Sequence, residues 1–366
     1  MNTNIGAVVI GTNYGVLAHV RALRNAGFDV LALVGRDTQK AAVRAKALGV
    51  PHGLGNLDEA LTLPGVNVVS VTTPPHTHAE ITLAAIAAGK HVLCEKPFAL
   101  NLAQARELLS AAERSGVVHF MGNEYRFGTT QESLRRVVAS GAIGDPTKAI
   151  IIRHRPSLTD PTTELPPWWE SAADGGGWLG ALGSHIIDQV RSTVGEFEAV
   201  SALLETLAPR RAMTADDTYT VQFRLVGGCT GILHSSCAIP GPTIATTKIS
   251  GTGGVAWLEG DSVMIDVGHG PHEVPDPEDL PQLPPDPPPV EFWPAYAKGT
   301  GWHISGLDLA LFTRLYERMR AQILGTPSDQ DPPAPTFADG AACQSVLDAA
   351  RTSAKRGGQW VEVEPV

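Results

Sequence analysis

The sequence predicts an α/β protein with two domains, a doubly wound parallel sheet followed by a domain on a large, mostly antiparallel open sheet. Short apolar runs alternate with helical patterns through the first third of the 366-residue chain. After about residue 125 the pattern changes to strands in which apolar and polar residues alternate. We therefore expect domains at 1–124 and 125–366, and the C-terminal helix could pack back on the first domain.

Composition and charge exclude several classes of protein. Lysine and arginine number 28 and aspartate and glutamate 38, a net charge of −10. This balance argues against nucleic acid as the main partner and against a basic membrane-binding face. The four cysteines do not have metal-finger spacing, so we expect neither a metal site nor a disulfide framework. The chain shows no signal peptide and no apolar run of membrane-spanning length, which favours a cytoplasmic protein.

The first strand, turn and helix form a dinucleotide-binding pattern. An apolar run at 5–10 ends in the glycine turn 11–15, a helix follows, and a second strand covers 29–34. Such a turn in a Rossmann fold brings backbone amides and the helix N-terminus to a pyrophosphate. We expect Gly11, Asn13 and Tyr14 at that position. Asn13 and Val16 replace residues that are glycine or alanine in the fingerprint, so a turn without a ligand remains an alternative.

The end of the second strand bears on the choice between NAD and NADP. Arg36 follows Gly35 there, and an arginine can receive the extra phosphate of NADP. Asp37 is expected to cap the helix at 38–48 instead of binding a ribose. The sequence therefore favours NADP, with NAD as the alternative.

The alternation continues to a strand that ends in charged residues. We expect strands at 66–71 and 117–121 and helices at 76–88 and 102–114. Between them, the apolar run before Glu95-Lys96-Pro97 predicts a buried strand, because Pro97 cannot continue it. Lys96 then lies at the carboxyl edge of a parallel sheet, where ligands bind. A solvated lysine at the end of a strand is the alternative.

The second domain contains two segments whose residues could take part in binding or catalysis. Trp168 and Trp169 are adjacent in an irregular stretch, and form either a hydrophobic plug or part of a substrate pocket. The glycine-rich segment 174–188 becomes helical, which places His185 and Asp188 one turn apart.

The rest of the chain predicts scaffold elements. We expect an alternating strand at 219–225, a glycine hairpin at 251–254 and an extended surface loop at 271–289. Helices at 307–324 and 338–356 and a strand at 360–363 complete the chain.

Several of these motifs resemble those of one family. Thr72-Thr73-Pro74-Pro75-His76-Thr77-His78-Ala79, Gly89-Lys90-His91-Val92, Glu95-Lys96-Pro97 and Asn123-Glu124-Tyr125-Arg126-Phe127 are similar to the glucose–fructose oxidoreductase / inositol dehydrogenase (Gfo/Idh/MocA) family, in its order and spacing. The resemblance implies an NAD(P)-dependent dehydrogenase that transfers a hydride between nicotinamide and a carbinol or carbonyl carbon of a sugar, glycoside, polyol or similar small molecule. It also implies a homo-oligomer, a dimer or a tetramer, that associates through the open sheet.

The resemblance implies two catalytic side chains. His185 would move the hydroxyl proton as a general base or acid, and Lys96 would donate a hydrogen bond to the same oxygen. Ala181 departs from the family, because a catalytic aspartate stands four positions before the histidine in its relatives. Asp174 or Asp188 could replace that carboxylate.

Further contacts follow from the same resemblance. On the cofactor side these contacts are Thr73, Pro74, His76 and Glu95, in addition to Arg36, Lys96 and the residues of the glycine turn. Candidate substrate contacts are Tyr125, Arg126, Trp168, Trp169 and Asp188.

Two other functional classes remain open. The first is an enzyme that uses bound nicotinamide without net redox change, for example for glycoside cleavage or elimination through a transient ketone. Its substrate would turn over without a net change in nicotinamide absorbance. The second is a non-catalytic binding protein on the same fold, which Ala181 supports. It would bind nicotinamide without turnover on a broad substrate panel.

Overall fold

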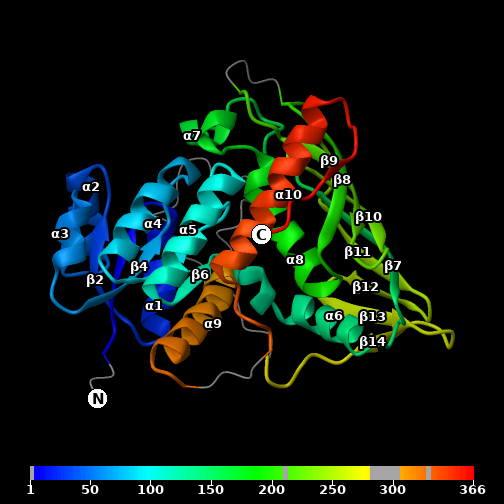
Figure 1. Cartoon of the computed structure of the whole chain (residues 1–366), viewed down its shortest axis with the longest axis horizontal. Coiled ribbons are helices and arrows are strands. Elements are labelled where there is room, and N and C mark those ends of the chain that lie inside the picture. Colours follow the sequence, from blue (N-terminus) through cyan, green and yellow to red (C-terminus); the bar gives the residue numbers. More distant parts are fainter. Residues whose placement is uncertain (1–3, 209–212, 281–305, 327–330) are drawn as a thin grey trace. The chain divides into compact units, whose positions relative to one another are not determined.

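The protein is described here from a computed structural model that covers residues 4–208, 213–280, 306–326 and 331–366 (Figure 1). The chain divides into two compact units, Met1–Glu124 with Leu283–Ala341 and Tyr125–Gln282 with Ala342–Val366. The predicted limits 1–124 and 125–366 stay a prediction, and each unit is described by itself.

The first unit contains a six-stranded parallel sheet in the order β3-β2-β1-β4-β5-β6, which confirms the predicted doubly wound fold. Its strands are β1 (Gly6–Ile10), β2 (Asp29–Val34), β3 (His52–Leu54), β4 (Val66–Val71), β5 (His91–Cys94) and β6 (His119–Met121). The strand order reverses between β1 and β4, and the carboxyl edge at that point is where such sheets bind ligands.

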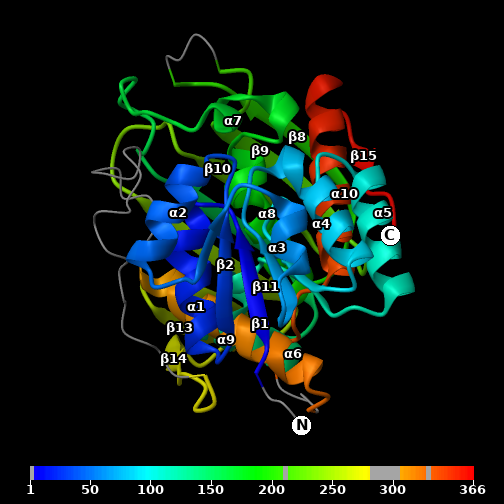
Figure 2. The ribbon, with the colours of Figure 1, turned by 90° about the vertical axis from the view of Figure 1, so that its left-hand side faces the viewer.

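Helices cover both faces of this sheet. Figure 2 shows α1 and α2 on one side and α3, α4 and α5 on the other. They are α1 (Val20–Asn25), α2 (Thr38–Ala47), α3 (Leu57–Thr62), α4 (His78–Ala87) and α5 (Leu102–Ser115). The short turns η1 (Gly15–His19) and η2 (Pro75–Thr77) lead into α1 and α4. The predicted cap is confirmed, because the Asp37 carboxylate accepts a hydrogen bond from the backbone amide of Lys40 at 2.9 Å.

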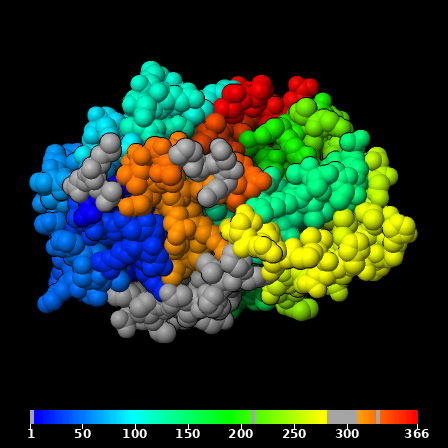
Figure 3. Space-filling view, turned by 90° about the horizontal axis from the view of Figure 1, so that it is seen from below, coloured from blue at the N-terminus to red at the C-terminus, as the bar shows by residue number. Residues whose placement is uncertain are grey.

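The helix α9 (Gly306–Ile323) also belongs to the first unit. It packs against α1 and η1, and Figure 3 shows it in orange beside the blue N-terminal elements. Its aromatic side chains Phe312 and Tyr316 are fully buried. This helix therefore brings a distant part of the chain to the first strand–turn–helix motif.

The second unit contains a nine-stranded sheet in the order β14-β13-β12-β11-β7-β10-β9-β8-β15. All neighbouring strands are antiparallel except β7 and β10, which confirms the predicted mostly antiparallel sheet. The strands are β7 (Pro146–His154), β8 (Phe197–Glu205), β9 (Thr218–Leu225), β10 (Thr230–Ser236), β11 (Ile244–Gly251), β12 (Val255–Glu259), β13 (Ser262–Asp266), β14 (His272–Val274) and β15 (Val361–Glu362).

Helices lie on one face of this sheet (Figure 1). They are α6 (Thr129–Ala139), α7 (Pro167–Glu170) and α8 (Ser184–Thr193), with turns η3 (Glu124–Phe127), η4 (Ala172–Asp174) and η5 (Leu179–Gly183). The helix α10 (Phe337–Lys355) begins in the first unit and ends in the second.

The expected loop at 271–289 was partly wrong, because residues 272–274 pair with β13 as an edge strand. Residues 281–289 of that loop lie outside the described residues. Within the part of the chain that the structure describes, no helix combines the length and the apolarity that crossing a membrane requires.

Candidate active site

The glycine turn after β1 lies against the end of β4. Gly11 has φ of 129°, and a Cβ there would lie 2.3 Å from the Thr72 hydroxyl oxygen. Only glycine fits without displacing Thr72, whose hydroxyl donates to the carbonyl of Ile10 at 2.8 Å. A turn this tight, followed by a helix, fits a bound pyrophosphate.

Two cations from α2 lie beside this turn. Lys40 Nζ donates to the Asn13 side-chain oxygen at 3.1 Å, and Arg44 Nη1 donates to the same oxygen at 3.2 Å and to the Thr12 carbonyl. Burial lowers the pKa of Lys40, and the charge of Arg44 lowers it further. Arg36, the predicted phosphate contact, is exposed at the end of β2. Lys40 and Arg44 were not among the predicted contacts, because in the sequence both look like solvent-facing residues of an ordinary helix.

Tyr14 turns toward the interior of the first unit. Its ring lies 5.5 Å from the ring of His19 and 6.0 Å from the ring of Phe312, edge-on to both. Tyr14 therefore packs between the glycine turn and α9, and its predicted contact with the cofactor stays a prediction.

The loop after β4 is fixed to the loop after β5 by His78. Its Nε2 lies 2.8 Å from the Thr73 carbonyl oxygen and its Nδ1 3.0 Å from the Pro97 carbonyl oxygen. Burial lowers the pKa of this imidazole. Thr73 and Pro74 are half-buried on this loop, while His76 is exposed. The structure thus joins the predicted nicotinamide-side loop to the segment that follows Lys96.

Glu95 is buried in a polar network beside Lys96. Its Oε1 lies 3.0 Å from His19 Nε2, and its Oε2 accepts a hydrogen bond from the Lys96 amide at 3.2 Å. His19 Nδ1 lies 2.7 Å from the Tyr316 hydroxyl, which lies 2.7 Å from the Ser70 hydroxyl. The peptide between Lys96 and Pro97 is cis, and the Lys96 side chain is half-buried at the carboxyl edge of the sheet.

In the second unit, His185 is buried in the first turn of α8. Its ring stacks on the ring of Tyr125, with centroids 4.1 Å apart and an interplanar angle of 13°. Ala181, where the family has its aspartate, lies one turn earlier in η5. The structure therefore brings Tyr125 to His185.

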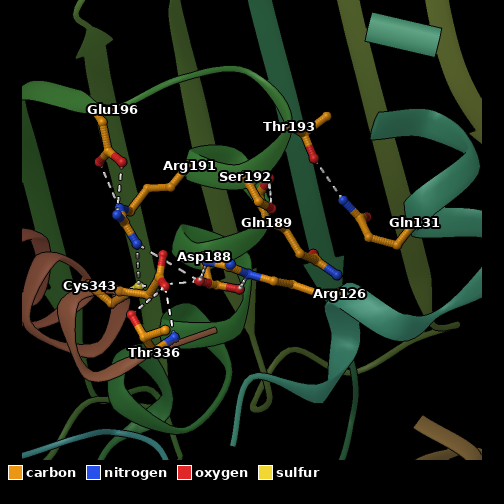
Figure 4. Close-up of polar contacts among 11 residues, drawn as sticks. Arg126, Gln131, Asp188, Gln189, Arg191, Ser192, Thr193, Glu196, Thr336 and Cys343 are labelled. Atoms are coloured by element: carbon orange, nitrogen blue, oxygen red, sulfur yellow. Dashed lines mark hydrogen bonds and ion pairs between the residues drawn. The ribbon is translucent and has the colours of Figure 1, made fainter. Parts of the chain in front are cut away.

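Asp188 forms a buried ion pair with an arginine. Arg126 Nε and Nη2 donate to the two carboxylate oxygens of Asp188 at 2.7 and 2.5 Å (Figure 4). The exposed fractions are 6% for Arg126 and 1% for Asp188. A buried two-pronged ion pair of this kind holds η3 to α8. In the structure the two residues are paired with each other, and their predicted role as substrate contacts stays untested.

The paired tryptophans differ in their surroundings. Trp169 is buried, with its ring 6.2 Å from Trp168 and 5.9 Å from Trp178. Trp168 is half-buried. Trp169 thus has the packing of a hydrophobic plug, and Trp168 is the one of the pair with partly accessible surface.

Lys96 belongs to the first unit and His185 to the second. Within the described residues, no group of three or more histidine, cysteine or acidic side chains has the arrangement of a metal site. All four cysteines are free and buried.

Comparison with known proteins identifies the families of both halves. Residues 5–123 match the oxidoreductase family with an NAD-binding Rossmann fold, GFO_IDH_MocA, and residues 132–257 match the GFO/IDH/MocA C-terminal domain. Levoglucosan dehydrogenase of Pseudarthrobacter phenanthrenivorans is 32% identical over 182 residues, which are 48% of this chain and 45% of that protein. Trans-1,2-dihydrobenzene-1,2-diol dehydrogenase of Mus musculus is 31% identical over 65% of this chain and 68% of that protein.

A solved structure matches the whole fold. Levoglucosan dehydrogenase in complex with NADH and L-sorbose superposes with a TM-score of 0.81 and 25% identity, covering 99% of each chain.

Proposed function

The chain belongs to the Gfo/Idh/MocA oxidoreductase family, and from this premise we propose that it transfers a hydride between nicotinamide and a carbinol or carbonyl carbon of a sugar, glycoside, polyol or similar small molecule. The observation that best supports this function is the position of Lys96 at the carboxyl edge of the parallel sheet, beside the buried carboxylate of Glu95. A cofactor of this class supplies the hydride acceptor. The protein then has to bind the substrate and transfer the proton of its hydroxyl group.

In this proposal Lys96 and His185 act on the same substrate oxygen. Lys96 donates a hydrogen bond to that oxygen and stabilises the negative charge that develops on it. His185 accepts its proton during oxidation and returns it during reduction. Stacking on Tyr125 fixes the plane of the His185 ring, which limits the directions in which it can accept a proton.

The test is turnover of sugars, polyols and their ketones, followed by the absorbance of reduced nicotinamide. We expect Lys96→Ala to lower kcat by about 10²–10³-fold, as for the loss of one oxyanion donor. Cofactor affinity should change much less, and can be measured by titrating the fluorescence of reduced nicotinamide. Activity close to wild type would remove Lys96 from the mechanism.

We propose NADP as the preferred cofactor. Arg36 at the end of β2 supports this, and so do Lys40 and Arg44, which place two more cations near the turn. NAD is the alternative that the family description favours.

Ala181 and the ion pair of Asp188 favour one second candidate, a non-catalytic nicotinamide-binding protein. Both carboxylate oxygens of Asp188 already accept hydrogen bonds from Arg126, which makes Asp188 a poor replacement for the missing aspartate. Nicotinamide binding without turnover on the full panel would favour this candidate. Turnover without net change in nicotinamide absorbance would instead favour an enzyme without net redox chemistry.

We also propose a homo-oligomer, a dimer or a tetramer, that forms through the open face of the nine-stranded sheet. A row of residues in register on this face is not buried in the single chain: Gln222, Ile232, Ile150, Lys248 and Trp257. Light scattering coupled to size-exclusion chromatography tests it, and a monomer would contradict it. The four free thiols support the further proposal of a cytoplasmic location.

A further inference from the structure

Arg153 lies on the covered face of the nine-stranded sheet. Arg153 of β7 is opposite Ser235 of β10, which is opposite Tyr219 of β9. Residues opposite one another in a sheet point to the same face. Ser235 and Tyr219 are fully buried, so Arg153 points to the side that the helices cover.

This face lies under the segment that carries His185. A Cβ on Gly183, two residues before His185, would lie 3.4 Å from the Tyr219 ring. Both Tyr219 and Tyr125, the residue stacked on His185, are close enough to interact electrostatically with Arg153. Arg153 therefore faces the same side of the sheet as the segment that carries the proposed general base, within one unit of the protein.

The charge of Arg153 is not balanced by a carboxylate of the described chain. Its hydrogen bonds go to neutral acceptors, the carbonyls of Ile152 and Thr246 at 2.9 and 2.6 Å and the Thr247 hydroxyl at 2.6 Å. Burial lowers the pKa of its guanidinium, and the nearby cation Arg155 lowers it further. A half-buried cation beside a second cation is costly unless an anion joins it.

The donors that remain on Arg153 suit a carboxylate. Its contacts use Nη1 twice and Nη2 once, so one N–H on Nε and one on Nη2 have no acceptor among the described residues. Other arginines of the chain use this same pair of atoms for carboxylates, although Arg136 binds Asp279 through Nη1 and Nη2. Arg126 binds Asp188 through Nε and Nη2, and Arg191 binds Glu196 through the same two atoms at 2.7 and 2.8 Å.

We propose that Arg153 binds a carboxylate of the substrate, so that the substrate is a sugar acid or a similar polyhydroxy acid. This rests on the proposed function, in which His185 moves the hydroxyl proton of the substrate. The carboxylate supplies the missing counter-charge, and its two oxygens match the guanidinium fork. A neutral sugar would leave the charge of Arg153 unbalanced, and the site would then select acids over their neutral analogues.

The test uses pairs of compounds that differ in one carboxylate, such as glucuronate and glucose, galacturonate and galactose, and gluconate and sorbitol. Binding to the full-length, cofactor-loaded protein is measured by calorimetry, and turnover by nicotinamide absorbance. We expect the acid of at least one pair to bind about 10- to 100-fold more tightly than its neutral partner, as for a hydrogen bond to a charged group. Glucose 6-phosphate is included, and tighter binding of it than of every acid would overturn the choice of a carboxylate.

Arg153→Gln should abolish this preference by weakening acid binding about 10- to 100-fold while neutral compounds change by less than about threefold. Arg153→Lys keeps the charge but not the fork, and should give intermediate acid affinity. It also serves if the glutamine variant fails to fold. The matched control is Arg224→Gln, because Arg224 is exposed and lies 3.7 Å from Glu198; it should leave the preference unchanged.

The possible failures can be told apart. Acid binding that depends on Arg153, without hydride transfer, would contradict the proposed function and support the carboxylate site. Equal or weaker binding of every acid would overturn the site even if neutral sugars are oxidised. Equal loss of acid and neutral binding in Arg153→Gln would show that Arg153 only ties β7 to β11.

Discussion

Replacement of Asp188 by asparagine tests whether the pair with Arg126 supports the fold. Asparagine keeps the size of the side chain but removes its charge, which leaves the buried guanidinium of Arg126 without its counter-charge. Breaking a buried ion pair in this way costs about 3–5 kcal/mol. For a cooperative unit of 150–250 residues, each kcal/mol lowers Tm by about 2–4 °C. We therefore expect Tm to fall by about 6–20 °C.

The assay is thermal unfolding followed by near-ultraviolet circular dichroism, with a control of the same chemistry. Asp279→Asn removes a carboxylate whose side chain is 60% exposed and which binds Arg136 at 2.7 Å. An exposed pair contributes about 0–1 kcal/mol, so this variant should keep its Tm within a few degrees. If Asp188→Asn unfolds no earlier than Asp279→Asn, the buried pair does not support the fold. Loss of substrate binding at unchanged Tm would restore Asp188 as a substrate contact.

Three more outcomes follow from the structure. Arg36→Ala should weaken NADP binding by about tenfold or more while NAD binding changes little, and equal effects on both would reject Arg36 as the phosphate contact. Gly122→Ala would place a Cβ 2.4 Å from Glu95 Oε1 and should lower stability by about 1–3 kcal/mol in denaturant titration; wild-type stability would show that Glu95 has another position. Burial raises the pKa of Asp216 from 3.8 to about 6, so the folded state binds the proton of this carboxyl group more tightly than the unfolded state does. The resulting stabilisation of the fold is fully present below pH 3.8 and is lost as pH rises through 6. Asp216→Asn should therefore raise Tm more at pH 7.5 than at pH 4, and a uniform change would contradict the shift.

The sequence predicted the elements of the first unit well because their signals are local. Apolar runs with glycine or proline at their ends mark β1, β2, β4 and β5, and Asp37 marks the start of α2. Neither β3 nor α3 was predicted, because their three and six residues are too short for a periodic pattern. The edge strand β14 lies in a proline-rich stretch and was not predicted either, because pairing with β13 overrides the local composition.

The site was less predictable because its contacts join distant residues. His19 and Tyr316 are 297 positions apart, and Arg126 and Asp188 are 62 apart. No periodicity or spacing in the sequence indicates that two such distant residues are in contact. Arg153, His154 and Arg155 at the end of β7 were a visible signal that could have indicated a ligand, since they follow a short apolar run as Glu95-Lys96 does.

Transfer of deuterium tests the central claim most directly. A sugar, polyol or sugar acid deuterated at the carbinol carbon is incubated with the protein and oxidised nicotinamide, and the reduced cofactor is examined by mass spectrometry. We predict one deuterium on the nicotinamide ring with the wild-type protein, and transfer slowed about 10²–10⁴-fold in His185→Ala with cofactor binding retained. Bound cofactor without deuterium transfer on the whole panel, or transfer at the wild-type rate in His185→Ala, would contradict the account.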